Sequence, residues 1–183
     1  NLVETLLKLY DEERLLDMGW GRHSLYRKLA NPGLHAQLLP YLTDATKGIV
    51  VRRVAIDIAE ACGLRSMQGN LADLILDSSE DLDTRIQAAY ALMRIGDVET
   101  KSRLRPLVLA PLSEDTQDEL KGCALASLWP HYLSGDEAFQ ALTPRKANSF
   151  SGAYGHFLSS VFPDAIDTVH LPAALHWLAQ QRT

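Results

Sequence analysis

The chain lacks any apolar run of the length that a membrane-spanning helix needs, about 18 to 20 residues. Its most apolar stretches, Gly48–Val51 and Leu74–Leu76, are interrupted by charged residues within a turn or two. We therefore expect a protein that neither spans nor binds a membrane.

Cysteine is also scarce. The only two in the chain, Cys62 and Cys123, stand inside helical patterns beside apolar neighbours. Two cysteines do not make a disulfide framework, and an unpaired cysteine behaves as a small buried hydrophobic residue. We expect two reduced core thiols, which fits a reducing, cytosolic setting.

Sequence motifs of catalysis and cofactor binding are missing. There is no phosphate-binding G-x-x-x-x-G-K-[ST] or G-x-G-x-x-G loop, no calcium-binding loop and no G-x-S-x-G nucleophile turn. We therefore predict no catalytic and no cofactor-binding residue in this chain, and no cofactor. The interpretation is that this stretch of sequence is not an enzyme.

Metal-ligand spacings are missing as well. No histidine has another four residues on, no cysteines cluster, and no histidine is followed by glutamate. His170 and His176 are six residues apart and do not share a helix face, and His131 is typical of a helix end. We predict no metal site. Trp20, Trp129 and Trp177 stand far apart in sequence and are expected to be buried anchors under loops and not an aromatic cage.

Charge and hydropathy describe an ordinary globular chain. Of the 183 residues, 46% are hydrophobic and 22% charged, enough apolar material for a continuous core. The net charge of −5 argues against nucleic-acid binding, which requires Lys and Arg to displace counterions.

Apolar residues recur at helical spacing almost throughout, and no stretch alternates as a strand would. In the first segment Leu2, Leu6, Leu9 and Leu16 are expected to share one buried face. Further helices are predicted at 46–62, 83–95, 116–129, 148–161 and 171–181.

Capping residues, glycine and proline mark where these helices begin and end. Gly63 stands in the position of a C-cap glycine, and Ser66 and Asp97 can cap the helices that follow them. Ser134–Glu137 has the S-x-x-E form of a capping box. Pro106 must kink or restart its helix because it has no N–H to donate.

An internal repeat is the strongest signal. Thr84–Leu92 can be set under Val51–Ala59 so that Arg85 falls on Arg52, 33 residues earlier. In Leu120–Leu128, Lys121 takes the same position 36 residues after Arg85. Ser151–Leu158 is interpreted as a degenerate fourth copy that lacks the basic residue. Terminal repeats often depart from the consensus in this way.

The repeated residues have a packing explanation. Ala55, Ala88 and Ala124 occupy the centre of each copy and allow close helix approach. One helix pair cannot bury its apolar stripe alone, so successive pairs must stack. The basic residue that opens each copy is expected to pair with carboxylates of neighbouring repeats.

The pattern basic-x-x-Ala-x-x-small-Leu closely resembles HEAT repeats over residues 34–162. The resemblance implies an all-α fold, a right-handed α–α superhelix or solenoid of antiparallel helix pairs. We treat 1–183 as a single repeat domain, with 1–33 as N-terminal helices and 163–183 as a terminal helix. The helical pattern is already present in residues 1–17, so we expect the chain to be part of a longer polypeptide.

A narrower resemblance is carried by Thr84–Leu92 with Arg103–Leu107, and by Leu120–Pro130. These tracts, with Gly152–Tyr154 and Leu171–Leu175, resemble the helical region that follows the nucleotide-binding module in large bacterial NACHT-type NTPases. The resemblance implies a cytoplasmic sensor or scaffold region. None of that family's catalytic motifs lies in this chain, so no catalytic role is carried over.

The leading functional hypothesis is a protein-interaction scaffold whose partner binds a concave face lined by the second helix of each pair. The exposed residues expected on that face are Arg53, Asp57, Glu60, Gln87, Arg94 and Glu119.

The alternative is a basic groove for nucleic acid, built from Arg52, Arg53, Arg65, Arg85, Arg94, Lys101, Arg103, Arg105 and Lys121. A third possibility, a HEAT-like lyase or hydroxylase, would need a metal or cofactor pocket that the sequence does not show.

The resemblance to NACHT-type NTPases is checked by sequencing the natural reading frame on both sides of the chain. We expect a G-x-x-x-x-G-K-[ST] loop several hundred residues upstream of Asn1. A frame that begins near Asn1 without such a loop would contradict the resemblance and leave a free-standing adaptor.

Overall fold

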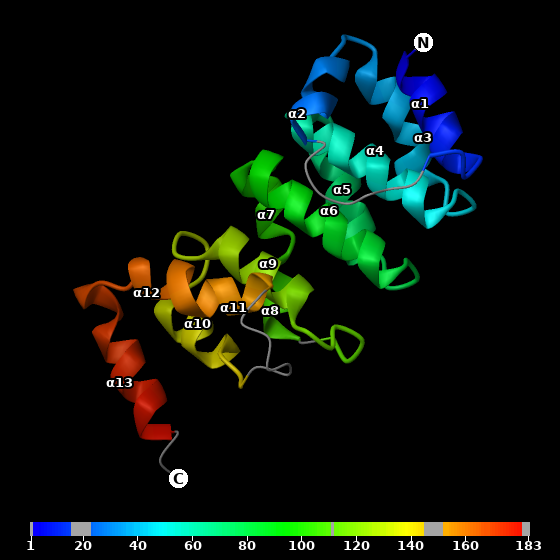
Figure 1. Ribbon diagram of the computed structural model, residues 1–183. Coiled ribbons are helices and arrows are strands. Elements are labelled where there is room, and N and C mark those ends of the chain that lie inside the picture. Colours follow the sequence, from blue (N-terminus) through cyan, green and yellow to red (C-terminus); the bar gives the residue numbers. More distant parts are fainter. Residues whose placement is uncertain (1, 16–22, 111, 145–151, 181–183) are drawn as a thin grey trace. The chain divides into compact units, whose positions relative to one another are not determined.

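The computed structural model describes residues 2–15, 23–110, 112–144 and 152–180 (Figure 1). Every regular element in these ranges is a helix, and none of the described residues forms a strand. The prediction of an all-α chain is therefore confirmed. The chain divides into two compact units, 1–100 and 101–183.

The first unit is built from paired helices in two layers. Its elements are α1 (Leu2–Asp11), α2 (His23–Tyr26) with a 3₁₀ turn (Arg27–Leu29), α3 (Leu34–Thr43), α4 (Ile49–Ala61), a 3₁₀ turn (Arg65–Met67), α5 (Gln68–Leu76) and α6 (Leu82–Ile95). Helix α7 (Val98–Ser102) spans the unit boundary. The first helices α3 and α5 pack on their second helices α4 and α6; α3 also contacts α5, and α4 contacts α6.

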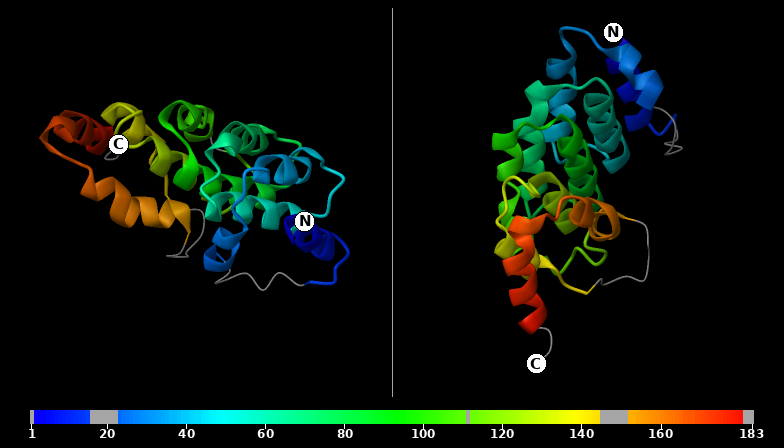
Figure 2. Two further views of the ribbon diagram at one scale, coloured as in Figure 1. Left: turned by 90° about the horizontal axis from the view of Figure 1, so that it is seen from above. Right: turned by 90° about the vertical axis from the view of Figure 1, so that its left-hand side faces the viewer.

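The second unit is built from shorter helices. Its elements are α8 (Arg105–Leu109), α9 (Glu119–Leu128), α10 (Gly135–Ala141), α11 (Ala153–His156), a π-helical turn (Phe157–Val161), α12 (Phe162–Asp164), a 3₁₀ turn (Thr168–His170) and α13 (Leu171–Gln180). Helix α8 packs on α9, α9 packs on α11, and α10 contacts both α8 and α13. The views in Figure 2 show α13 (red) beside α10 (yellow).

Two buried arginines at the repeat position bind the carbonyl end of the preceding helix. Nε of Arg52 donates to the carbonyl of Tyr41 at 3.2 Å, and Nη2 donates to that of Leu42 at 3.4 Å, at the end of α3. Nε of Arg85 donates to the carbonyl of Ile75 at 2.9 Å, near the end of α5. The last carbonyls of a helix have no partner within it. Each arginine therefore caps the first helix of its own pair.

The predicted pairing of the repeat's basic residue with a carboxylate is present at Arg52, which forms a buried ion pair with Glu80. Lys121, which occupies the same position in the third copy, has other partners. Its Nζ donates to Oγ1 of Thr143 at 2.7 Å and lies 4.9 Å from the ring centre of Tyr154. The basic position is thus kept and buried in all three copies, while its partners change.

A second repeated feature lies in the loops after α3 and α5. Oδ1 of Asp44 accepts hydrogen bonds from the backbone N and Oγ1 of Thr46, at 2.9 and 2.6 Å. Asp77, 33 residues later, does the same with Ser79 at the same two distances. These bonds lower the pKa of both carboxyl groups, the side-chain bond most. The sequence pattern D-x-[ST] at a spacing of 33 could have revealed this feature.

Most predicted helix boundaries hold. Gly63 follows α4 with φ +61°, as a C-cap glycine should, and Asp97 accepts a bond from the backbone N of Thr100 at 2.9 Å. The capping box of Ser134 and Glu137 is present. Pro106 stands in the first turn of α8, where the helix restarts.

Ser66 was wrongly predicted as an N-cap. It lies in a 3₁₀ turn, and its hydroxyl is 2.9 Å from Nδ1 of His35 on another helix.

Several helix predictions also need correction. The helix predicted at 46–62 begins at Ile49. Of the helix predicted at 148–161, residues 148–151 lie outside the described residues, and the rest is α11 followed by a π-helical turn. In α1 the buried face is Val3, Leu7 and Tyr10, whereas Leu2 is 71% exposed; Leu16 lies outside the described residues. Helix α9 begins at Glu119 and not at 116, because Asp118 adopts a left-handed conformation with φ +58°. A non-glycine residue in that conformation stops a helix from extending toward its N-terminus.

Helices α9 and α11 of the second unit approach each other closely at Gly122 of α9. A Cβ on Gly122 would overlap the backbone N of Tyr154 and lie 2.5 Å from the carbonyl carbon of Ala153. Both of those atoms belong to the start of α11, so α9 and α11 meet backbone to backbone. The fully buried Ala124 lies two residues further along α9, and its counterparts Ala55 and Ala88 are equally buried.

We expect Gly122→Ala to destabilise the protein by about 3 kcal/mol or more, because two backbones must separate to admit the methyl group. Gly69→Ala in α5 is the matched control, since nothing lies within 4 Å of the added Cβ. It should stabilise by about 0.5 to 1 kcal/mol through helix propensity. Urea unfolding measures both. A neutral Gly122→Ala would contradict the close approach.

The pair between Arg52 and Glu80 predicts a pH dependence. The hydrogen bond from Arg52 lowers the pKa of Glu80 from its ordinary 4.5, despite desolvation. A lowered folded-state pKa gives stability that is present above the unfolded pKa and lost as the pH falls through the folded one.

Glu80→Gln should therefore cost about 3 kcal/mol at neutral pH, and the difference from wild type should shrink below pH 4.5. Urea titrations from pH 7 downward measure this, with the exposed Glu4→Gln as control. A difference that stays constant across that range would contradict the ion pair.

Candidate functional site

Polar side chains connect the second helices α4 and α6 across their outer surface. Asp57 accepts a hydrogen bond from the amide of Gln87, and Glu60 pairs with Arg94. Gln87, Tyr90 and Arg94 recur at spacings of three and four, so they share one side of α6. We define the α4–α6 face as the surface formed by these residues with Arg53 and Met93.

The structure places the six residues predicted for the concave face in different situations. Glu60 was expected to be exposed and is only 8% exposed, because it lies beneath Arg94, whose side chain is 65% exposed. Asp57 and Gln87 are half-buried and bonded to each other. In the second unit, half-buried Glu119 accepts a bond from the backbone N of Ala153 at 3.0 Å.

Arg53 is the member of this set with unused hydrogen-bonding capacity. Its side chain is half-buried, and its Nε is enclosed without a hydrogen-bond partner among the described residues. A buried, unsatisfied donor is costly unless a partner or water reaches it. The Nε of Arg53 is therefore a buried, unsatisfied donor on the α4–α6 face, which also carries the half-buried Tyr90 and Met93.

The nine basic residues of the nucleic-acid alternative do not form one surface. Arg52, Arg85 and Lys121 are 2 to 3% exposed, so they cannot reach a phosphate backbone. Arg94 is paired with Glu60. Arg105 binds Glu137 and donates to the carbonyl of Tyr132 at 3.0 Å. The others are Arg53, half-buried in the first unit, together with Arg65, Lys101 and Arg103.

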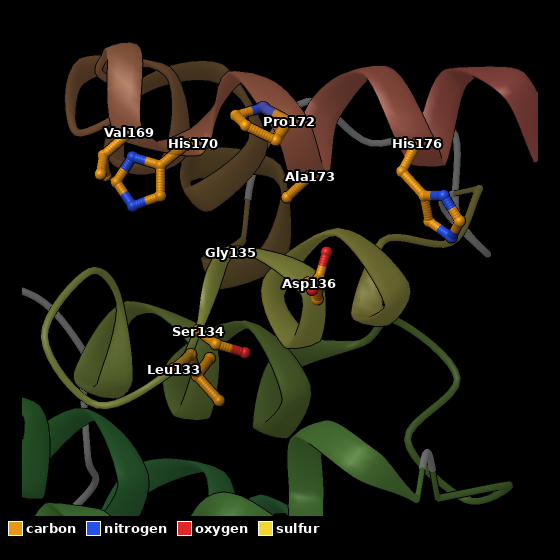
Figure 3. A pocket seen from close by; sticks show the side chains of 9 residues that line it. All are labelled: Leu133, Ser134, Gly135, Asp136, Val169, His170, Pro172, Ala173 and His176. Atoms are coloured by element: carbon orange, nitrogen blue, oxygen red, sulfur yellow. The ribbon is translucent and has the colours of Figure 1, made fainter.

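An open pocket of about 550 Å³ lies between α10 and the start of α13 (Figure 3). Its lining includes His170 and His176, which lie at opposite ends of the pocket in Figure 3, and Asp136 of α10. Nδ1 of His170 lies 2.9 Å from Oδ1 of Asp167, and Nε2 of His176 lies 2.9 Å from the amide nitrogen of Gln180. Each imidazole thus already has a neighbour on its own helical segment.

The pocket does not gather a metal-binding set. Among the residues that the structure describes, no group of three or more His, Cys, Asp or Glu side chains could hold a metal ion. The lining is completed by Ser134, Gly135 and apolar residues such as Val169. We assign it no chemistry.

Aromatic side chains form one cluster in the second unit. The ring of Trp129 lies 5.1 Å from that of Phe162 and 4.7 Å from that of His170. Phe139 lies 5.1 Å from Phe162 and 6.0 Å from Trp177. Trp129 is buried, as predicted, whereas Trp177 is only half-buried. Both rings belong to this cluster, and Trp20 lies outside the described residues.

Both cysteines are free thiols, as predicted. Cys62 is half-buried and donates to the carbonyl of Tyr26 at 3.2 Å. Burial raises the pKa of Cys62, and raises that of the fully enclosed Cys123 strongly. A raised pKa removes the thiolate that a nucleophile needs, so neither thiol is poised for catalysis.

None of the helices that the structure describes has both the length and the apolar character needed to span a bilayer. No protein-family model, curated protein or solved structure matches this chain.

Proposed function

We propose that this chain is a non-catalytic scaffold that binds a protein partner on the α4–α6 face, and that its helix pairs form a HEAT-like solenoid. The observation that carries the proposal is the composition of that face. Half-buried tyrosine, methionine and arginine side chains stand on the same two helices as a set of intramolecular polar bonds. Tyr, Met and Arg are enriched where proteins bind one another.

The bonds between α4 and α6 prepare this face for binding. Asp57–Gln87 and Glu60–Arg94 hold the two helices together before any partner arrives. Less side-chain entropy is then lost on association, and preorganised surfaces bind more tightly for that reason. The mixed signs of Arg53, Asp57 and Arg94 suit a partner with complementary charges of both signs.

The helix contacts support the repeat part of the proposal. In the first unit, first helices contact first helices and second helices contact second helices, the pattern expected of stacked pairs. Attachment of this scaffold to an upstream signalling NTPase is also proposed, on the resemblance of Thr84–Leu92 and Leu120–Pro130 alone.

We expect the double variant Arg53→Glu, Met93→Glu to lose a partner that the wild type captures, with at least about a tenfold loss of bound protein. The matched control is Lys28→Glu, Leu25→Glu, which makes the same kinds of change at exposed positions of the same unit. Affinity capture quantified by mass spectrometry measures the difference, after thermal melts show that both variants are folded.

Equal capture by the face variant and the control would contradict the proposal. Capture that is abolished by nuclease and weakened steeply by salt would instead support the nucleic-acid alternative.

A further inference from the structure

The charged side chains of the α4–α6 face differ in depth. The side chain of Glu60 is 4% exposed, whereas that of Arg94, which pairs with it, is 65% exposed. Asp57 is half-buried and accepts a hydrogen bond from Gln87. Both carboxylates of this face are therefore engaged by α6, and the most exposed charge on it is a guanidinium.

The two arginines of the face have donors to spare. A guanidinium has five N–H donors and no acceptor. Arg94 uses its Nη1 on Glu60, and the enclosed Nε of Arg53 has no partner among the described residues. A carboxylate matches a guanidinium with two parallel hydrogen bonds. A lysine brought to the same place would oppose donors with donors and like charge with like charge.

The spacing of the two guanidinium groups is set by α4. Arg53 and Glu60 are seven residues apart on this helix, which is two turns or about 10 Å along its axis. Arg94 lies against Glu60, so its charge is found near the far end of that stretch. In a partner helix the same distance separates residues i and i+7, which lie on one side of the helix.

We propose that the partner of the α4–α6 face presents an acidic helix, with carboxylates at positions i and i+7 that bind Arg53 and Arg94. This inference rests on the proposed function and adds the chemistry of the partner to it. Two turns of the partner helix match two turns of α4, so both carboxylates reach a guanidinium at once. Half-buried Met93 offers the same helix an apolar contact beside Arg94.

The charge of the whole chain makes this proposal selective. The chain carries −5, so at long range it repels an acidic molecule. Binding of an acidic helix therefore requires a local match to the two arginines and does not follow from a general positive potential. Two acidic helices of equal charge should be distinguished by the spacing of their carboxylates alone.

An NMR titration of the full chain with alanine-based helical peptides tests the spacing. The probe carries glutamates at i and i+7, and its matched control carries them at i and i+3, about 4.5 Å apart. The wild type should bind the probe about fivefold more tightly than the control, because only the probe can bind both arginines at once. The Nε–Hε signals of Arg53 and Arg94 should shift with that binding.

A charge swap tests the contact at Arg53. Arg53→Glu should weaken binding of the diglutamate probe about fivefold or more. A peptide in which one of the two glutamates is replaced by lysine should bind this variant more tightly than it binds the wild type. Recovery with the second peptide excludes misfolding as the cause of the loss. Lys28→Glu, at an exposed position outside the face, should bind both peptides as the wild type does.

Three results would overturn the acidic-helix proposal: equal binding of the i+7 and i+3 peptides, a charge swap without recovery, or tighter binding of an oligothymidylate of equal charge. None of them overturns the proposed function. That function fails separately, if Arg53→Glu, Met93→Glu captures as much partner as its control.

Discussion

The first unit depends on one constraint: the carbonyl groups that end each first helix must find donors in an apolar interior. Arg52 and Arg85 supply those donors from the second helix of the same pair. A hydrogen bond from a charged donor is worth about 1.5 to 3 kcal/mol, and a buried acceptor left unpaired costs a similar amount. Because a guanidinium has several donors, Arg52 can also bind Glu80, so one residue joins its own pair to the next.

The helices of the second unit are held together by a different kind of contact. Gly122 follows the basic position directly and allows α9 to meet α11 at the backbone. Lys121 then reaches Thr143 and the face of Tyr154, whose hydroxyl in turn donates to the carbonyl of Thr143 at 2.8 Å. Close approach has replaced helix capping as the feature that aligns the helices. This explains why a lysine suffices where the first unit uses arginines.

Polar bonds between α4 and α6 decide which of their side chains are exposed. Glu60 was misplaced from sequence because its partner, Arg94, is 34 residues away, and helical periodicity carries no information about the next pair. The same distance problem hid the aromatic cluster, in which Trp129 and Trp177 reach a common core through Phe139 and Phe162.

The sequence by itself determined the helices, most of their ends and the repeated basic position, because propensity, capping and periodicity act over a few residues. It also carried, at a spacing of 33, the Asp44 and Asp77 loop signal that shows the first two pairs to be alike. Only the tertiary structure decided which side of α1 is buried, that Ser66 binds His35, and that the leucines of α13 are exposed. Those outcomes depend on which helices become neighbours, and local sequence does not encode that choice.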